Sequence, residues 1–354
     1  MHVETSNILE CNITGRDLKE SVEQIRDTIG GKIEERWGEY VLTVNNSNAT
    51  GEIRFITFDW GVNLLQLEMV FHKECIISVD ASKFNPIQFI YCLKGYCRHS
   101  FDYQKRINTI EQHQSVIITS RYGGYNYAYF PKDEKLVLNV IKVVREKYLK
   151  KRLNNVFQLK NQLFQVFTDK KQEKAYAHFG ALNFKLLNKI ETLQKIKKKG
   201  ITRILLIEGI VYQILSMHIQ EYEYLMIEKN SPKVLLEGEL KLINDLAERI
   251  ANSVSHEYSL ENLSKETGLS KAKLQEGFKV LFGRTVTEYI RHVRLETAID
   301  LISKNDMNMS EVMYAIGFSS RSYFSKIFKE KYGIAPNDFK NRLKLPVKEI
   351  IDAS

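Results

Sequence analysis

Apolar residues recur with helical spacing in the last third of the chain, and they do so twice. From Leu263 to Tyr289 the sequence reads LSKETGLSKAKLQEGFKVLFGRTVTEY, and from Val312 to Phe339 it reads VMYAIGFSSRSYFSKIFKEKYGIAPNDF. The segments align at an offset of 49 residues at their start and of 50 residues from Leu274 and Phe324 onward. Such self-similarity predicts two copies of one structural unit.

Each copy predicts a short helix, a tight turn at glycine and a second helix opened by serine. In the first copy, Gly268 ends one helix, because the position after a helix favours the left-handed region that glycine adopts. Ser270 then caps the next helix. In the second copy, Gly317 is predicted to form the turn and Ser319 to cap the second helix. This is the helix-turn-helix layout, whose second helix fits the major groove of DNA.

The polar faces of the two second helices are the candidate binding surfaces. Between the copies, residues 285–303 predict one long amphipathic helix. For one copy alone, a helical hairpin with a solvated outer face would explain the pattern equally well, but two copies at a near-constant offset favour the helix-turn-helix. The residues predicted to face outward are Lys271, Lys273, Gln275, Glu276 and Lys279 in the first copy, and Ser320, Arg321, Ser322, Ser325, Lys326 and Lys329 in the second.

Residues from about 240 to 345 resemble the DNA-binding domain of the AraC/XylS family of bacterial transcription regulators. The resemblance is carried by GLSKAKLQEGFKVLFGRTVTEYI, by the linker RHVRLETAIDLI and by IGFSSRSYFSKIFKEKYGIAPNDFK. It implies seven helices and two recognition helices that enter successive segments of the major groove. It also carries base-reading roles onto Ala272, Gln275, Glu276, Arg321, Ser322 and Lys326.

Among these residues, Arg321 is the strongest candidate for reading a base, because arginine pairs bidentately with guanine. Gln275 can pair with adenine by the same logic. Glu276 departs from the basic residue often found at its position. It either accepts a hydrogen bond from cytosine or repels phosphate.

The front of the chain has β texture, so we expect an α+β protein. Residues 31–145 hold several short runs rich in branched and aromatic residues, separated by turn signals, which suggests a sandwich or a barrel. A short amphipathic helix is expected from Leu18 to Ile29. The resemblance implies that this part is a cupin-like β-barrel sensor followed by a helical connector. The runs are EYVLTV, EIRFITF, NLLQLEMVF, CIISV, IQFIYCL, SVIITS and KLVLNVIKVV.

A tyrosine cluster in this region is a second candidate site. Alternation along a strand places Tyr125, Tyr127 and Tyr129 on one face. That face either packs against a helix or a partner, or forms the aromatic wall of a ligand pocket. No His-x-His pair, Gly-rich phosphate loop, nucleophile elbow or HExxH pattern occurs, so we expect no metal, no cofactor and no catalytic residue.

Helical periodicity dominates residues 146–228, and Ser231-Pro232 is a candidate linker. We therefore divide the chain into a β-rich effector-sensing domain at 1–145, a helical connector and dimerisation region at 146–232, a DNA-binding domain at 233–345 and a tail at 346–354. The net charge is +9, which is usual for nucleic-acid binders. The basic excess lies mainly between residues 131 and 232 rather than in the predicted DNA-binding domain.

The remaining features bear on the compartment. The sequence shows no signal peptide and no 18-residue apolar stretch, so we expect a cytoplasmic protein with no membrane partner. The four cysteines form no CxxC pair, and a reducing compartment would keep them as thiols. Cys92 and Cys97 flank a predicted turn at Lys94-Gly95, so either a redox switch or a buried structural role is open to them.

The resemblance and the order of the domains indicate a sequence-specific regulator of transcription that responds to a small-molecule effector. Its expected partners are double-stranded operator DNA, the effector, a second copy in a homodimer and RNA polymerase. Two alternatives remain: an architectural DNA-binding protein without an effector, and a cupin-type enzyme fused to a DNA-binding domain.

Overall fold

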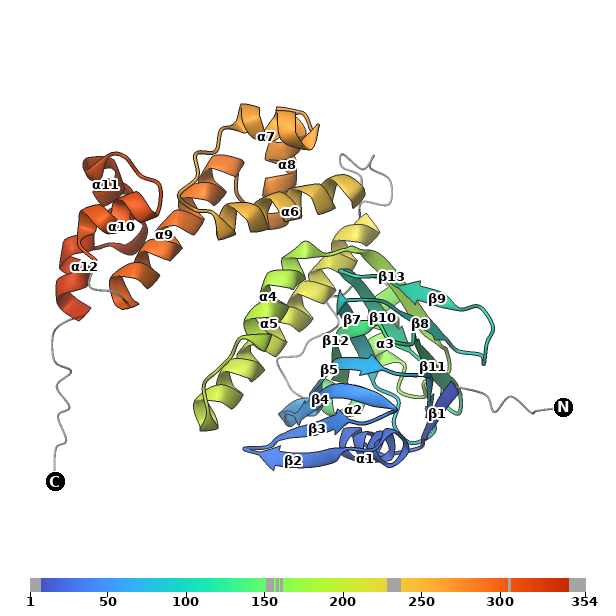
Figure 1. Ribbon diagram of the computed structural model, residues 1–354. Helices are drawn as coiled ribbons and strands as arrows, with labels where there is room; N and C mark the ends of the chain where they lie inside the picture. Colours follow the sequence, from blue (N-terminus) through green and yellow to red (C-terminus); the bar gives the residue numbers. More distant parts are fainter. Residues whose placement is uncertain are drawn as a thin grey trace, which may run out of the picture. The chain divides into compact units, whose positions relative to one another are not determined.

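The computed structural model describes residues 8–150, 156, 159, 162–227, 237–304 and 307–343. The chain forms two compact units, Met1–Ser231 and Pro232–Ser354. Figure 1 shows strands and covering helices in the N-terminal unit, and helices throughout the described residues of the C-terminal unit. The predicted α+β class is confirmed at this level.

Two β-sheets form the N-terminal unit. The five-stranded sheet has the order β1-β6-β11-β8-β9, with β1 parallel to β6 and the other pairs antiparallel. It comprises β1 (Ile8–Ile13), β6 (Glu74–Asp80), β8 (Cys97–Ser100), β9 (Asn108–Ile110) and β11 (Tyr125–Phe130).

The second sheet has eight strands in the order β13-β10-β7-β12-β5-β4-β3-β2, all antiparallel. Its strands are β2 (Lys32–Arg36), β3 (Glu39–Asn45), β4 (Ala49–Thr57), β5 (Val62–Phe71), β7 (Ile87–Lys94), β10 (Gln114–Thr119), β12 (Lys135–Val143) and β13 (Tyr176–Leu182). Strand pairing leaves each sheet with two edge strands, so the described strands form no closed barrel. The predicted cupin-like barrel is therefore not confirmed.

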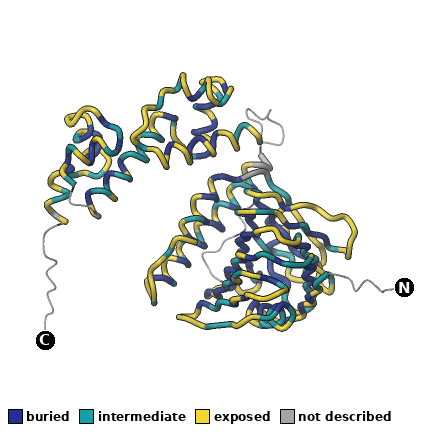
Figure 2. Tube along the Cα trace, viewed as in Figure 1, coloured by how far each residue is buried: buried dark blue, intermediate teal, exposed yellow. Residues whose placement is uncertain are grey.

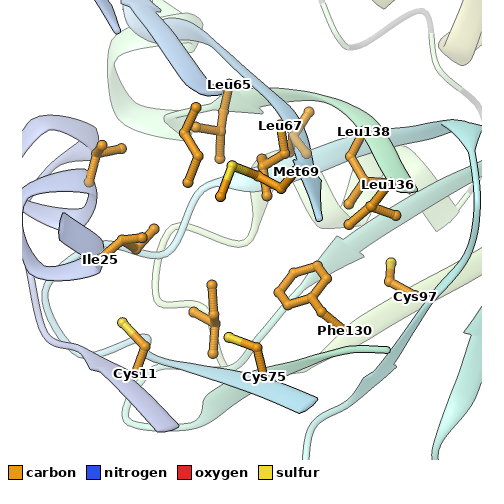
Figure 3. Close-up of a cluster of buried hydrophobic side chains, with 14 of the residues drawn as sticks. Cys11, Ile25, Leu65, Leu67, Met69, Cys75, Cys97, Phe130, Leu136 and Leu138 are labelled. Atoms are coloured by element: carbon orange, nitrogen blue, oxygen red, sulfur yellow. The ribbon is translucent and has the colours of Figure 1, made fainter. Parts of the chain in front are cut away.

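The core of this unit lies between the two sheets. Figure 3 shows side chains from both sheets and from helix α1 (Leu18–Ile29) meeting there. Alternation explains the pattern, because every second residue of a strand points to the same face. The buried residues include Ile25, Leu65, Cys75, Phe130 and Leu138.

Helices cover the outer face of the eight-stranded sheet. They are α3 (Gln162–Thr168), α4 (Phe184–Gln194) and the long α5 (Gly200–Ile227), whereas α2 (Arg145–Lys150) contacts the single turn η1 (Asp59–Gly61). Two polar contacts attach α5 to the sheet. The Ser115 hydroxyl lies 2.7 Å from Nδ1 of the buried His218, and Arg203 donates two hydrogen bonds to the buried Glu39 carboxylate.

The structure corrects the prediction for residues 146–228, which were expected to be helical throughout. Within this range Tyr176–Leu182 forms β13, which pairs with β10 and becomes an edge of the larger sheet. Periodicity missed it because the segment YAHFGAL is short and lies between polar residues and a helix. Most of residues 151–161, which carry part of the predicted helical periodicity, lie outside the described residues.

Helix α5 is apolar along most of its length. Residues Gly200–Tyr224 are long and apolar enough to cross a membrane by length and composition, so the prediction that the chain has no such apolar stretch is wrong. Only 22% of an apolar 18-residue stretch within this helix is buried inside the structure. Arg203 and His218 nevertheless fix this helix to the sheet, and Figure 2 shows exposed residues along its other side.

The C-terminal unit has seven helices within its described residues, as the resemblance implies. They are α6 (Glu237–Asn252), α7 (Leu260–Thr267), α8 (Lys271–Phe282), α9 (Val286–Lys304), α10 (Met309–Ala315), α11 (Arg321–Tyr332) and α12 (Pro336–Leu343). The long helix predicted at 285–303 is α9. It buries Leu295, Ala298 and Ile302 against α10 and α11.

Candidate nucleic-acid interface

Two helix-turn-helix arrangements, α7–α8 and α10–α11, carry the predicted DNA-contacting residues. In the first arrangement Gly268 has a φ of 70° and ends α7, and the Ser270 hydroxyl accepts a hydrogen bond from the Lys273 backbone N–H. These are the roles predicted from the sequence. Leu274 and Phe278 are buried, so the opposite face of α8 is the one available to a ligand.

The second arrangement differs by one residue in its turn. Gly317 has a φ of 77°, which fits the predicted turn, and Phe318 is buried. The cap of α11, however, is Ser320, whose hydroxyl accepts from the Tyr323 backbone N–H at 3.3 Å. The prediction that Ser319 caps this helix is wrong. The extra residue of the second copy lies before the cap, so Ser270 corresponds to Ser320.

This correction changes which residues occupy equivalent positions on the two helices. At the constant offset of 50, Lys271 corresponds to Arg321 and Ala272 to Ser322. By the same offset Glu276 corresponds to Lys326. The charge at that equivalent position therefore reverses between the two copies. Tyr323, which is 47% exposed, was not among the predicted site residues, although it occupies the position in the second copy that Lys273 occupies in the first.

On α11 the predicted residues form an exposed polar face. Ser320, Arg321, Ser322, Lys326 and Lys329 are exposed, and Ser325 is half-buried. Within the described part of the chain, Arg321 has no hydrogen bond or ion pair. Lys326 has only a 4.0 Å ion pair with Glu330, one turn away, and its side chain is 73% exposed. Solvent-exposed pairs of this kind contribute little to stability, so Lys326 can exchange its partner for a phosphate.

On α8 several of the predicted residues already have partners within the unit. Lys273 forms a 2.5 Å ion pair with Glu239 of α6, whose side chain is only 15% exposed. The Gln275 side-chain oxygen accepts a hydrogen bond from the backbone N–H of Val286, the first residue of α9. Ala272, Glu276 and Lys279 are exposed. Bidentate pairing with adenine needs the same oxygen of Gln275. In this structure that oxygen is already engaged by the start of α9.

The predicted tyrosine cluster lies on the outer face of the five-stranded sheet. The rings of Tyr125 and Tyr127 stack at 5.7 Å, and Tyr103 meets Tyr127 edge-on at 5.5 Å. The Tyr129 hydroxyl accepts from the Gln104 backbone N–H at 2.8 Å and lies 3.2 Å from the Ser100 hydroxyl. This face is an aromatic patch held by hydrogen bonds.

A cavity of about 110 Å³ lies between the two sheets, and the alternate residues of β11, Asn126, Ala128 and Phe130, line it. Tyr125, Tyr127 and Tyr129 are not among its lining residues. The prediction that these tyrosines form a ligand wall therefore does not apply to this cavity. The pleat of the strand sends them to the opposite face.

All four cysteines are buried free thiols. Burial raises the pKa of the Cys92 thiol to about 12 and raises those of Cys75 and Cys97 as well. Cys92 donates its S–H towards the carbonyl oxygens of Lys94 and Gly95. Protonated, buried thiols are poor nucleophiles. The structural role, rather than the redox switch, fits these observations.

Among the described residues, no group of three His, Cys, Asp or Glu side chains is placed to hold a metal ion.

Comparison with known proteins matches residues 263–342 to a family described as a helix-turn-helix domain. The chain is 32% identical over 108 residues to histidine kinase P4 of Formosa agariphila, covering 30% of this chain and 7% of the relative. It is 23% identical over 173 residues to the Msm operon regulatory protein of Streptococcus mutans, covering 48% of this chain and 60% of the relative. It is 29% identical over 101 residues to the transcriptional activator RhaR of Enterobacter sp., covering 28% of this chain and 36% of the relative. In each case this chain spans less than two thirds of the relative's length.

Proposed function

We propose that this chain, which belongs to the AraC/XylS family by its C-terminal helix-turn-helix domain, is a sequence-specific DNA-binding regulator of transcription. The observation that carries the proposal is the exposed polar face of α11, where Arg321 and Lys326 stand at the N-terminal half of a capped helix. Arginine presents a rigid fork of donors to guanine, and lysine neutralises phosphate. Regulation takes place on cytoplasmic DNA and involves RNA polymerase as the downstream partner.

The roles of the two second helices differ in this proposal. On α11, Arg321 and Ser322 read base edges, while Lys326 and Lys329 lie against the groove walls. On α8, Ala272 and Glu276 face bases, and Lys279 contacts the backbone. Lys273 and Gln275 hold the helix in place through Glu239 and α9. The two helices thus enter successive stretches of the major groove.

Selection from a pool of random DNA duplexes tests this function. We expect the full chain to enrich one sequence motif with two segments. Arg321→Ala should lose the information at one base position of that motif. Lys265→Ala is the matched control, because Lys265 is an exposed basic residue on α7, outside both second helices. Recovery of unselected sequence at undiminished affinity would instead identify an architectural DNA-binding protein.

The N-terminal unit supplies effector sensing and dimerisation in this proposal. Large apolar side chains stand exposed on α5, with Ile201 at 75%, Leu205 at 60% and Tyr224 at 56% exposure. A second copy that covered this face would bury them. Two linked DNA-binding units would then bind paired half-sites at a raised effective concentration. The effector would occupy the cavity between the sheets and favour one arrangement of the units.

Sedimentation of the full chain tests the dimer. We expect a concentration-dependent dimer that Leu205→Glu converts to a monomer, because a buried carboxylate without a partner is costly. Glu223→Gln, a polar change on the same helix, is the control. A wild-type chain that sediments as a monomer at working concentration, and binds operator no better than a fragment from residue 233 onward, would contradict the dimer.

A further inference from the structure

The cavity between the two sheets has mostly apolar walls, with a few polar residues among them. Figure 3 shows Ile25, Leu65, Leu67, Phe130 and Leu138, which line it from α1 and from both sheets. The polar lining residues are Ser21, Gln88, Arg98, His99, Asn126 and Lys142. At about 110 Å³, the cavity is somewhat smaller than an engineered apolar cavity of about 150 Å³ that holds benzene.

Lys142 is the unusual member of this lining. It lies on β12 with the parity of Leu138 and Val140, the residues that point between the sheets, and it is only 8% exposed. Its ammonium nitrogen lies 5.9 Å from the centre of the Phe84 ring. Among the residues that the structure describes, no carboxylate lies within ion-pairing distance of that nitrogen.

The residues that line the cavity together with Lys142 include two uncharged amides, Gln88 and Asn126, and one imidazole, His99. Gln88 is the register partner of Lys142 on β7, beside Ile118 of β10. On the opposite sheet, Nε2 of His99 lies 3.2 Å from the Asn126 side-chain oxygen, and burial lowers the pKa of His99 to about 4. His99 therefore adds no charge at neutral pH. The lining has one other cationic residue, Arg98, whose register partner on β11 is Tyr129, on the face that points away from the cavity.

A buried ammonium without a counter-ion costs free energy, and proteins normally pair such a group or replace it. Burial lowers the pKa of Lys142 to about 8, so the ammonium is still the main form at neutral pH. An apolar side chain such as Met would fill the same space without this cost. An anion inside the cavity would give the ammonium its missing partner.

We propose that this cavity binds a small monocarboxylate with a compact apolar body, and that the carboxylate pairs with Lys142. The apolar walls would take the short aliphatic chain or single ring, and the amides of Gln88 and Asn126 would supply further donors to the carboxylate. This inference rests on the proposed sensing function and assigns the chemical class of the effector. The volume excludes long-chain acids from the cavity as it stands.

Isothermal titration and thermal unfolding of the full chain, without DNA, test the inference. The probes are benzoate and butyrate, compared with benzyl alcohol and 1-butanol as uncharged analogues of matched shape. We expect the carboxylates to raise the melting temperature of the N-terminal unit and to bind about tenfold more tightly, or better, than the alcohols, because charged hydrogen bonds are stronger.

Lys142→Met removes the charge and keeps the length of the side chain. We expect this variant to lose the preference for carboxylate over alcohol. The matched control is Lys135→Met on the same strand, where Lys135 pairs with Glu68 at the surface and is 48% exposed. If Lys142→Met fails to fold, the carboxylate-to-alcohol ratio of the wild type decides the question alone.

Equal affinity of the wild type for benzoate and benzyl alcohol would overturn the inference. So would unchanged carboxylate binding by a folded Lys142→Met variant, or no binding of either acid. The proposed function fails separately. A chain that binds benzoate through Lys142, but whose operator affinity does not respond to it, retains the ligand site and loses the sensing role.

Discussion

The two helix-turn-helix copies share a sequence plan but differ in how their second helices are held. On α8, Lys273 pairs with Glu239 of α6, and Gln275 caps the start of α9. On α11, the equivalent residues are Tyr323 and Ser325, and within the described residues neither has such a contact to another helix through its polar atoms. The first helix is thus tied into its unit by its polar residues. The second presents them to solvent.

The turns at Gly268 and Gly317 also differ in how closely they pack against the rest of the unit. A Cβ on Gly268 would meet no atom within 4 Å, so this glycine is needed only for its positive φ. A Cβ on Gly317 would lie 2.8 Å from the Ser255 carbonyl oxygen and 2.9 Å from the Arg294 guanidinium. Arg294 itself donates to the carbonyl oxygens of Val254 and His256. The second copy is therefore held through its backbone turn, which leaves its recognition face free.

Substitution of these glycines tests the contrast most strongly. Alanine in the left-handed region costs about 1–2 kcal/mol, and overpacking against Ser255 adds about 1–3 kcal/mol. We expect Gly317→Ala to lower the free energy of unfolding of the C-terminal unit by about 2–5 kcal/mol, and Gly268→Ala by only about 1–2 kcal/mol. Urea unfolding of the full chain measures both. Equal losses of unfolding free energy in the two variants would mean that the backbone at Ser255 can move to accept the added methyl group at no energetic cost.

Base reading should be concentrated on the second copy. We expect Arg321→Ala to weaken operator binding by about 1–3 kcal/mol and to relax specificity at one base pair, because its fork of donors has no partner among the residues that the structure describes. Lys271, its structural counterpart, lies 3.8 Å from Glu261 in an exposed ion pair. Lys271→Ala should cost less and leave the base preference intact. Operator titrations against a panel of single-base variants measure both effects.

Helix ends, turns and caps could be predicted from the sequence, because each depends on the backbone or capping preference of a single residue. Gly268 ended α7, Gly317 formed the second turn, Ser270 capped α8, and Leu18–Ile29 formed α1, because φ preference and side-chain capping act within a few residues. The choice between Ser319 and Ser320 went wrong for the same local reason. Either serine can cap a helix, and only the folded length of the turn decides between them.

What depends on pairing across the chain was not predicted. The sequence could not show that Gln275 bonds to Val286, that Glu239 holds Lys273, or that β13 adds to the edge at β10. Lys142 was overlooked because a lysine inside a strand is ordinarily assigned to the solvent face. The available signal was the alternation along the strand, since the apolar residues Leu138 and Val140 lie four and two residues before Lys142 and therefore on the same face.

Phosphate contacts should follow the free lysines of α11. We expect Lys326→Ala and Lys329→Ala each to weaken specific and non-specific DNA binding alike and to reduce the slope of log affinity against log salt by about 0.9. Lys265→Ala, on the outside of α7, should leave the slope unchanged. Binding isotherms at several salt concentrations measure the slopes. A loss confined to the specific site with an unchanged slope would make these lysines base readers.

The smallest expected effect concerns the hydrogen bond between Gln275 of α8 and the backbone N–H of Val286 at the start of α9. Gln275→Ala removes the acceptor of the Val286 N–H at a partly exposed helix start, so we expect it to lower the free energy of unfolding by about 0.5–1.5 kcal/mol. Ser325→Ala, the change at the equivalent position of α11, is the control and should have little effect on stability. The base preference of the Gln275→Ala variant shows whether Gln275 serves to attach α8 to α9 or to contact a base in the DNA complex. An unchanged preference means that Gln275 stays on α9 in the complex. Relaxed preference at an adenine position would mean that DNA draws the side chain away from Val286, and the first copy would then read bases as the second does.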